Sequence, residues 1–372
     1  MRHVLSEVAD VTMGQSPKSE FYNSEGLGMP FLQGNRTFGK RYPVFDTYTT
    51  MPTKTAKAGD VIMSVRAPVG DLNITPVDIC LGRGVCGIRM KNGNQDFLYY
   101  LLKYYMPHLI NKESGTVFGS VNRNDINELE IDIPDDADDQ KRIARVLAKL
   151  DEKIEENDSI NENLLQLTQS IFAKEFLSFG SIPSGWQESS LLGIADYLNG
   201  LAMQKYRPAD DEQGLPVLKI KELRQGSCDS NSELCSPSIK PDYLVHDGDV
   251  VFSWSGSLLV DFWCGGTCGL NQHLFKVTSS TYDKWFYYAW TNHHLQKFAA
   301  IAADMATTMG HIKREELAKA KVLIPPQSDY DRIGSLMAPL YDLVIANRIE
   351  NRKLATLRDE LLPKLLSGQL DI

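Results

Sequence analysis

The chain has 372 residues, 42% of them hydrophobic, which is enough to bury a large core and to form two domains. No stretch of about 18 apolar residues is present, which excludes a membrane-spanning helix, and the N-terminal segment MRHVLSEVADV lacks the pattern of a signal peptide. The six cysteines are therefore expected to be reduced thiols in the cytoplasm. The net charge of −9 does not exclude nucleic acid, because twelve acidic and only six basic residues lie between 131 and 179, leaving the rest near neutral.

Residues 1–134 predict a globular part made mostly of strands. The run VIMSV (61–65) is β-branched and follows a Gly-Asp turn, and LEIDIP (129–134) is a second strand that proline closes. Between them, residues 95–111 have apolar side chains at three- and four-residue spacing, which predicts a helix.

A long helix is predicted next, over residues 139–179. This stretch contains neither proline nor glycine, and its apolar residues recur on one side of a helix, first three and four apart and then in whole heptads. At 1.5 Å per residue it would be a rod roughly 60 Å long. Because its apolar stripe is narrow, it needs a partner helix.

Residues 180–326 predict a second globular part that repeats the first. PVLK (216–219) corresponds to PFLQ (30–33), GDVVFS (248–253) to GDVIMS (59–64), and AKVLIP (320–325) to LEIDIP. The offset between the copies drifts only from 186 to 191, so the chain reads as a tandem duplication. A helix is expected over 282–303. The segments between the shared points differ widely, for example 36–46 against 224–234.

The partner helix is predicted at the C-terminus, over 330–366. YDRIGSLMAPL (330–340) aligns with QKRIARVLAKL (140–150) at a constant offset of 190, and the asparagines coincide as well. An asparagine on an apolar seam costs stability but can fix the register. We expect an antiparallel coiled coil within the chain, with two unrelated helices docked on their own domains as the alternative. The predicted pairing residues are Ile143, Leu147, Leu150, Ile154, Asn157, Leu164, Ile171, Ile333, Leu340, Val344, Asn347, Leu354 and Leu361.

Two prolines distinguish the second helix from the first. Pro339 and Pro363 each remove a helical hydrogen bond, so the second rod is expected to start after Pro339 or to bend there.

The organisation resembles the specificity (S) subunits of type I restriction-modification systems. The resemblance is carried by the two long helices, the segment 150–157, the terminal LRDELLPKLLSGQLDI (357–372) and the paired Gly-Asp-Val turns, and it covers essentially the whole chain. It implies an α+β fold: two strand-rich, mixed α/β target recognition domains related by a pseudo-twofold tandem repeat and joined by an antiparallel coiled coil. The implied domains are 1–134 and 180–326, with helical spacers at 135–179 and 327–372.

The resemblance also implies partners. Each domain would read half of a split site in double-stranded DNA, and the helices would dock methyltransferase (M) subunits and, through the complex, restriction (R) subunits. The chain itself would have no catalytic residues and no cofactor, since S-adenosylmethionine would bind the methyltransferase.

Residues that can contact base edges or phosphates cluster in matching loops of the two globular parts. Base contact needs Arg, Lys, Asn, Gln or Ser side chains in loops that can enter the major groove. The candidates are Gln33, Asn35, Arg36, Lys40, Arg41, Arg66, Arg83, Ser120 and Arg123 in the first part, and Lys219, Lys221, Arg224, Ser253, Trp254, Ser255, Asn271, Gln272, His273, His311 and Lys313 in the second.

Several catalytic motifs are absent or incomplete. Residues 82–87 match G-x-G-x-x-G, but a strand rather than a helix is expected to follow, which argues against a dinucleotide site. Cys264, Cys268 and His273 lack the spacing of a zinc knuckle. No phosphate-binding loop and no amino-methyltransferase motif is found. A recognition half fused to a nuclease or methyltransferase, and a coiled-coil adaptor without DNA affinity, are the alternative hypotheses.

Overall fold

The computed structural model describes residues 2–111, 120–304 and 312–370. The chain divides into two compact units, Met1–Glu152 with Ala355–Ile372, and Lys153–Leu354. Both long helices therefore contribute to both units. Within the described residues, no helix is long and apolar enough to cross a membrane.

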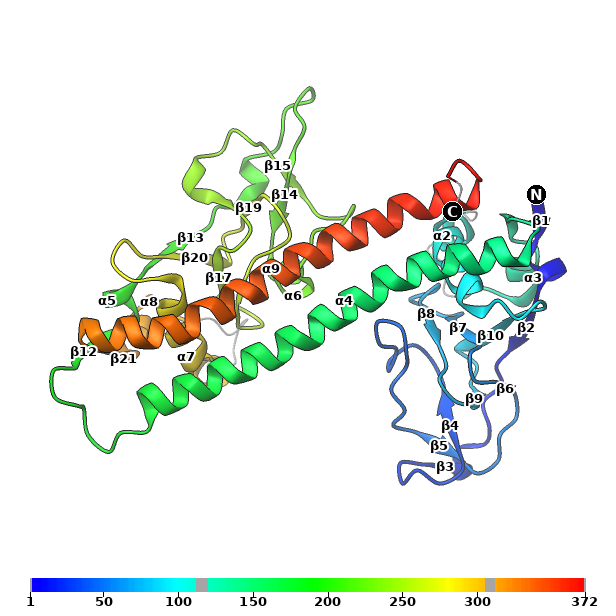
Figure 1. Ribbon diagram of the computed structural model, residues 1–372, viewed down its shortest axis with the longest axis horizontal. Helices are drawn as coiled ribbons and strands as arrows, with labels where there is room; N and C mark the ends of the chain where they lie inside the picture. Colours follow the sequence, from blue (N-terminus) through cyan, green and yellow to red (C-terminus); the bar gives the residue numbers. More distant parts are fainter. Residues whose placement is uncertain (1, 112–119, 305–311, 371–372) are drawn as a thin grey trace. The chain divides into compact units, whose positions relative to one another are not determined.

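The described residues of the first unit form two main sheets, a short strand pair and several short or medium helices (Figure 1). The antiparallel sheet has the order β2 (Ala9–Met13), β10 (Val85–Met90), β7 (Val61–Ser64), β8 (Leu72–Ile74). The second sheet, in which β4 and β9 are parallel, has the order β3 (Tyr22–Asn23), β5 (Tyr48–Thr49), β4 (Met29–Leu32), β9 (Ile79–Leu81), β6 (Thr55–Ala56). The remaining elements are β1 (Arg2–Val4) paired with β11 (Glu130–Asp132), and α1 (Leu5–Val8), η1 (Ser19–Phe21), α2 (Gln95–Asn111) and α3 (Arg123–Asn127).

The second unit repeats this arrangement. Its antiparallel sheet has the order β13 (Asp196–Asn199), β20 (Leu274–Thr278), β17 (Val250–Ser253), β18 (Leu259–Phe262). Its other sheet, again with a parallel central pair, has the order β15 (Leu234–Cys235), β14 (Leu215–Leu218), β19 (Cys268–Leu270), β16 (Leu244–Val245). The remaining elements are β12 (Gln187–Ser190) paired with β21 (Lys321–Ile324), and α5 (Leu191–Ile194), η3 (Met203–Lys205), α6 (Ile220–Gln225), η4 (Pro241–Tyr243), α7 (Lys284–Asp304) and α8 (Arg314–Lys319). The predicted fold class and tandem repeat are confirmed.

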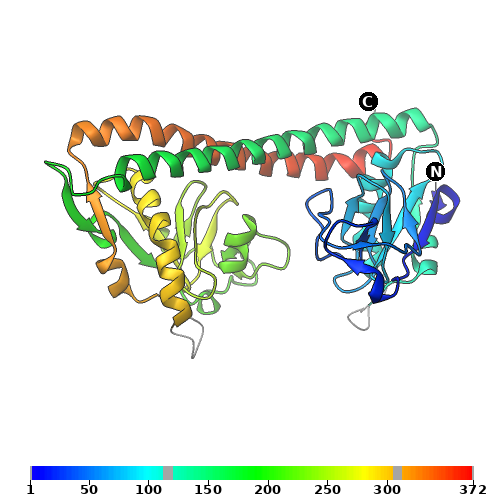
Figure 2. The ribbon, with the colours of Figure 1, turned by 90° about the horizontal axis from the view of Figure 1, so that it is seen from below.

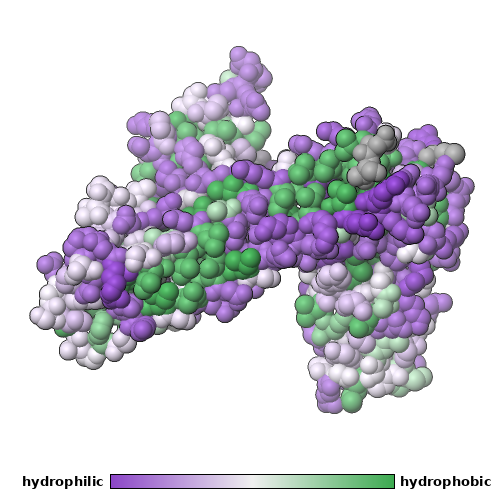
Figure 3. All heavy atoms as spheres, in the orientation of Figure 1, coloured by the Kyte–Doolittle hydropathy of each residue, from purple (hydrophilic) through white to green (hydrophobic). Residues whose placement is uncertain are grey.

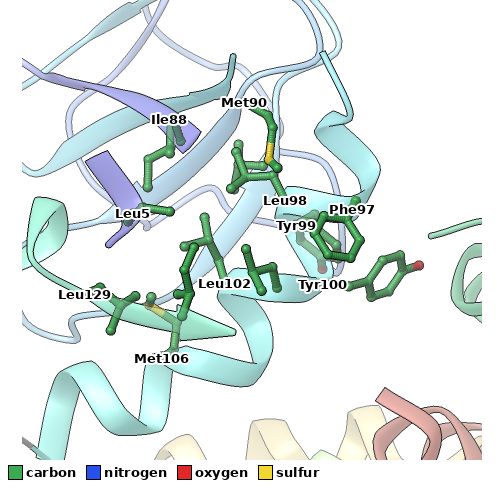
Figure 4. Close-up of a cluster of buried hydrophobic side chains, with 14 of the residues drawn as sticks. Leu5, Ile88, Met90, Phe97, Leu98, Tyr99, Tyr100, Leu102, Met106 and Leu129 are labelled. Atoms are coloured by element: carbon green, nitrogen blue, oxygen red, sulfur yellow. The ribbon is translucent and has the colours of Figure 1, made fainter. Parts of the chain in front are cut away.

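Each unit has its own hydrophobic core between the antiparallel sheet and its helix. In the first unit, α2 covers the sheet with Phe97, Leu98 and Leu102, which are at most 1% exposed (Figure 4). Each such side chain contributes roughly 1.5–3 kcal/mol by leaving water. Tyr100 also belongs to this cluster, but its hydroxyl points away from the other labelled side chains (Figure 4).

The two long helices are α4 (Ala137–Phe172), which continues as a short π-helical turn η2 (Ala173–Leu177), and α9 (Gln327–Leu366) (Figure 2). They pair antiparallel, as predicted. Asn157 Nδ2 donates to Asn351 Oδ1 (2.8 Å), whereas further along α4 the Asn161 Oδ1 accepts from Asn347 (2.9 Å). Asn157, Asn161 and Asn347 are all at most 9% exposed, so the seam carries the expected polar register marks.

One detail of the helix prediction needs correction. The helix α9 begins at Gln327 and runs through Pro339, so the second rod does not start after that proline. The predicted pairing residues Ile143, Leu147 and Ile333 also belong to the hydrophobic cores of the globular parts, in clusters that include residues of the other long helix such as Leu365 and Phe172. The ends of the apolar stripe therefore pack on a globular part as well.

Candidate nucleic-acid interface

Backbone hydrogen bonds bring four loops of the first unit together. The amide of Gly84 donates to the carbonyl of Gln33, and the carbonyl of Gly84 accepts from the amide of Val65, both at 2.9 Å. The carbonyl of Val65 accepts in turn from the amide of Val121 at 2.9 Å. The loops that follow β4, β7 and β9 and the one that precedes α3 therefore meet at one edge of the unit, although the sequence separates them by up to about ninety residues.

Five predicted DNA-contacting residues are exposed on these loops: Gln33, Arg66, Arg83, Ser120 and Arg123. Arg66 and Ser120 form a backbone bridge, and Arg123 is the first residue of α3. Within the described part of the chain, the guanidinium groups of Arg66 and Arg83 have no acidic partner. Two uncompensated cations beside an exposed amide suit a polyanion with hydrogen-bonding base edges.

In the segment 35–41, unlike at Arg66 and Arg83, two of the predicted residues are bonded to carboxylates. Asn35 donates to Asp71 (2.6 Å), and Arg36 pairs with Asp46 (2.6 Å), a bond that lowers the pKa of the Asp46 carboxyl. The Arg36–Asp46 pair is exposed, so DNA phosphate can compete for the guanidinium at little cost. Lys40 is exposed.

Arg41 is a correction to the predicted surface set. It is 9% exposed, lies 3.0 Å from Asp96, and stands over the ring of Tyr99 at 5.6 Å. Its side chain therefore fastens the loop to α2 and is not presented to a ligand.

The second unit holds its loops with matching hydrogen bonds. The amide of Asn271 donates to the carbonyl of Leu218 (3.1 Å), just as that of Gly82 donates to Leu32 in the first unit (2.7 Å). The amide of Ile312 donates to the carbonyl of Trp254 (2.9 Å), in the place of the Val121–Val65 bond.

A cluster that contains an indole and an imidazole ring lies at this edge of the second unit. Trp254 is half-buried; its indole N–H donates to Asn199 (3.0 Å), and its ring lies 6.1 Å from that of His273. The Nδ1 of His273 lies 3.2 Å from the hydroxyl of Ser255. Gln272 and His273 reach the surface beside them.

Three predicted residues of the second unit are buried and build the framework. Ser253 is fully buried and donates to the carbonyl of Ser255, which is itself 6% exposed. Asn271 is 7% exposed and accepts from the amide of His273 (3.2 Å). Ser253, Ser255 and Asn271 are therefore not presented on the surface as base-contacting side chains would be: Ser253 and Asn271 bond within their own loops, and Ser255 bonds to the neighbouring loop.

The predicted lysines of this unit are largely paired. Lys219 lies 2.6 Å from Glu233 and Lys221 lies 3.0 Å from Asp229, which lowers the pKa of both carboxyl groups. Arg224, in the last turn of α6, and Lys313, just before α8, are exposed. His311 falls outside the described residues.

Glycines that sequence reasoning did not use turn out to position the loops. A Cβ atom on Gly14 would lie 2.1 Å from the carbonyl oxygen of Gly82, and one on Gly200 would lie 2.2 Å from that of Asn271. Gly14 and Gly200 are related by the repeat offset of 186, so comparing the two copies residue by residue would have revealed them.

The G-x-G-x-x-G match has the same structural origin. Cβ atoms on Gly82 and Gly84 would meet the backbone of Gln33 at 2.7 and 2.3 Å, and the segment runs directly into β10 rather than into a helix. These glycines permit two backbones to touch. Among the described residues, no group of three or more His, Cys, Asp or Glu is placed to hold a metal ion.

The long helices expose a second surface. Ile160 and Leu167 on α4, and Leu336 and Leu343 on α9, are 42–48% exposed, and the members of each pair are seven residues apart on one side of their helix. Hydrophobic residues gather over the long helices in Figure 3. Exposed apolar side chains grouped on one side of a helix are typical of a protein-binding surface.

A duplicated α/β domain with divergent polar loops, combined with paired helices, defines a two-module recognition protein. The chain belongs to the family described as type I restriction modification DNA specificity domain, whose model matches residues 3–166 and 183–358. The role of DNA sequence specificity follows from this membership.

Two curated relatives come from Methanocaldococcus jannaschii. The chain is 25% identical over 402 aligned residues to the type I restriction enzyme MjaIX specificity subunit, covering 99% of this chain and 93% of the relative. It is 42% identical over 147 residues to the putative type I restriction enzyme MjaX specificity subunit, covering 39% of this chain and 34% of that protein. The fold matches the crystal structure of the type I restriction-modification S subunit from M. genitalium, with a TM-score of 0.59 at 16% identity, over 98% of this chain and 95% of the other.

Proposed function

We propose that this protein is the non-catalytic DNA-recognition and assembly subunit of a cytoplasmic type I restriction-modification complex. Each unit reads one half of a split double-stranded DNA site, and the paired helices set the separation of the two halves. Reading two half-sites at a fixed spacing is what dimeric DNA-binding proteins do with two chains. Two unlike units in one chain permit a site that is not palindromic.

The observation that carries the proposal is the contrast between framework and surface at the loop edge. The same backbone hydrogen bonds hold the loops of both units. The side chains at matching positions differ: the exposed Arg66 and Arg83 of the first unit correspond to the buried Ser255 and the half-buried Gln272 of the second. A framework kept in both copies while its polar surface varies is expected of two modules that read different bases.

The complex supplies the chemistry. Methyltransferase subunits bind S-adenosylmethionine and dock on the heptad-spaced apolar positions Ile160, Leu167, Leu336 and Leu343, and restriction subunits join through that complex. The exposed apolar side chains support this assignment, because burying them against a partner removes them from water.

The decisive experiment replaces residues 183–326 with the corresponding segment of a family member of different specificity. The target site of the tagged complex is then mapped before and after the exchange. One half of the bipartite site is expected to change while the other half is kept. An unchanged site would refute the proposal.

Two further measurements separate the assembly role from its rivals. Tagged protein carrying Ile160→Glu and Leu167→Glu is expected to lose a methyltransferase that co-purifies with the wild type and with the control Gln169→Glu, which changes an exposed residue on the opposite side of α4. Purified chain incubated with DNA, Mg²⁺ and S-adenosylmethionine is expected to leave the DNA unchanged. Cleavage or methylation by the chain alone would favour a fused enzyme, and absence of DNA affinity in the assembled complex would favour an adaptor.

A further inference from the structure

Arg83 and Gln272 occupy the same position in the two units, as three matched hydrogen bonds establish. Gly14 donates to the carbonyl of Val85 (3.0 Å) as Gly200 does to that of Leu274 (3.0 Å). The amide of the following residue donates to the carbonyl of Leu81 in one unit (2.8 Å) and Leu270 in the other (2.9 Å). In the third pair, the amide of Gly82 donates to the carbonyl of Leu32, and the amide of Asn271 donates to that of Leu218. In both units the residue in question is the second after β9 or β19.

This position is held rigidly in each unit. In the first, no Cβ fits on either glycine beside Arg83, and the Arg83 amide donates to the hydroxyl of Ser16 (3.2 Å). In the second, the Gln272 amide donates to the carbonyl of Leu201 (2.8 Å). A side chain on such a support loses little backbone freedom when it binds, which favours specific hydrogen bonding.

The guanidinium of Arg83 is prepared for a bidentate contact. It is exposed on a loop next to Gln33, and among the described residues no carboxylate pairs with it. Arg89 on β10, in contrast, forms an ion pair with Asp60 at 2.7 Å. Arginine donates two parallel hydrogen bonds to the O6 and N7 acceptors of guanine in the major groove.

The carboxamide of Gln272 is oriented by its neighbours. Its Nε2 lies 3.2 Å from Nε2 of His273, and because an amide nitrogen only donates, that ring nitrogen accepts. The Nδ1–H of His273 then donates to the hydroxyl of Ser255 (3.2 Å). The Oε1 and the second N–H of Gln272 remain to face a ligand. Glutamine pairs in this way with the N6 donor and N7 acceptor of adenine.

We propose that Arg83 reads a guanine in one half-site and Gln272 reads an adenine at the corresponding position of the other, with Ser255 and His273 as positioning residues for Gln272. This inference rests on the proposed function and assigns base classes that the family resemblance does not supply. It predicts that the two half-sites share one geometrically equivalent position at which they differ by guanine against adenine.

The test is selection of bound duplexes from a randomised DNA library by the tagged complex, followed by sequencing. The variant Arg83→Gln is expected to change one guanine of one half-site to adenine, and Gln272→Arg to change one adenine of the other half-site to guanine. A bidentate pair discriminates by about tenfold or more, so the change in base frequency is large. Arg83→Ala is expected to lose the preference at that position only.

Matched controls and distinct failures make the result decisive. Arg2→Gln and Gln187→Arg replace the same residue types at exposed positions on the short strand pairs β1–β11 and β12–β21 and are expected to leave both half-sites unchanged. The untouched half-site reports that each variant is folded. A bipartite site that keeps its bases in Arg83→Gln and Gln272→Arg, or a uniform loss of affinity without a change of base, would overturn the inference alone. Failure of the wild-type complex to select a bipartite site would overturn the proposed function itself.

Discussion

The substitution Arg358→Gln is expected to destabilise the first unit far more than a typical surface change. Arg358 on α9 lies 2.5 Å from Asp151 on α4, and the side chains are only 13% and 12% exposed. The other carboxylate oxygen of Asp151 accepts a hydrogen bond from the hydroxyl of Tyr100 (2.7 Å). Burial, and to a lesser extent Asp151, raises the pKa of Tyr100, so its hydroxyl keeps its proton and remains a donor. Without Arg358, a nearly buried carboxylate loses its counter-charge.

The expected magnitude follows from that burial. Removing one partner of a buried ion pair costs about 3–5 kcal/mol, and the small remaining exposure places this pair near 3 kcal/mol. For a unit of this size, that corresponds to a fall of roughly 6–12 °C in Tm. Pairing Arg358→Gln with Asp151→Asn removes the uncompensated charge and keeps an acceptor for Tyr100, so about half of the loss should be recovered.

The assay is denaturant and thermal unfolding of the full chain, with the two single variants and the double variant forming a cycle. Arg142→Gln is the control, because Arg142 also pairs with an aspartate, Asp139, but in solvent, and a small effect is expected. The reasoning is refuted if Arg358→Gln costs no more than the control, or if the double variant is as unstable as Arg358→Gln alone.

Three other predictions concern packing and pH. Burial lowers the pKa of His293 and His294. As the pH falls below about 6.5, the unfolded chain therefore binds protons that the folded chain does not, and the free energy of unfolding should be lower at pH 5 than at pH 7. Replacing both histidines by glutamine should make the free energy of unfolding less dependent on pH. Asn161→Leu alone should cost about 1–3 kcal/mol by leaving the buried Asn347 amide without its acceptor, whereas leucine at both positions should restore or raise the stability, as unfolding in urea would show. Gly14→Ala should destabilise the protein, since the new Cβ would lie 2.1 Å from a backbone carbonyl oxygen. Calorimetry should show a lower Tm for this variant, and a Tm equal to that of the wild type would contradict the prediction.

The sequence by itself determined the helices, the repeat and the fold class, because periodicity and duplication are local or register-based signals. The heptad spacing around Asn157 and Asn347 needed no tertiary information to place both asparagines on one seam. The Gly-Asp-Val turns and the matching strands that follow them, β7 and β17, were likewise predicted by comparing the chain with itself.

Only the tertiary structure decided which polar residues face solvent. Arg41, Ser253 and Asn271 are residue types suited to base contact, but the fold buries them, and nothing in their neighbouring sequence distinguishes them from Arg83 or Gln272. Likewise, the heptad positions of Ile143 and Ile333 predict helix pairing but do not show that both side chains also belong to the cores of the globular parts. Exposure depends on which segments, distant in the sequence, pack against each other, and helical period and residue type carry no information on that.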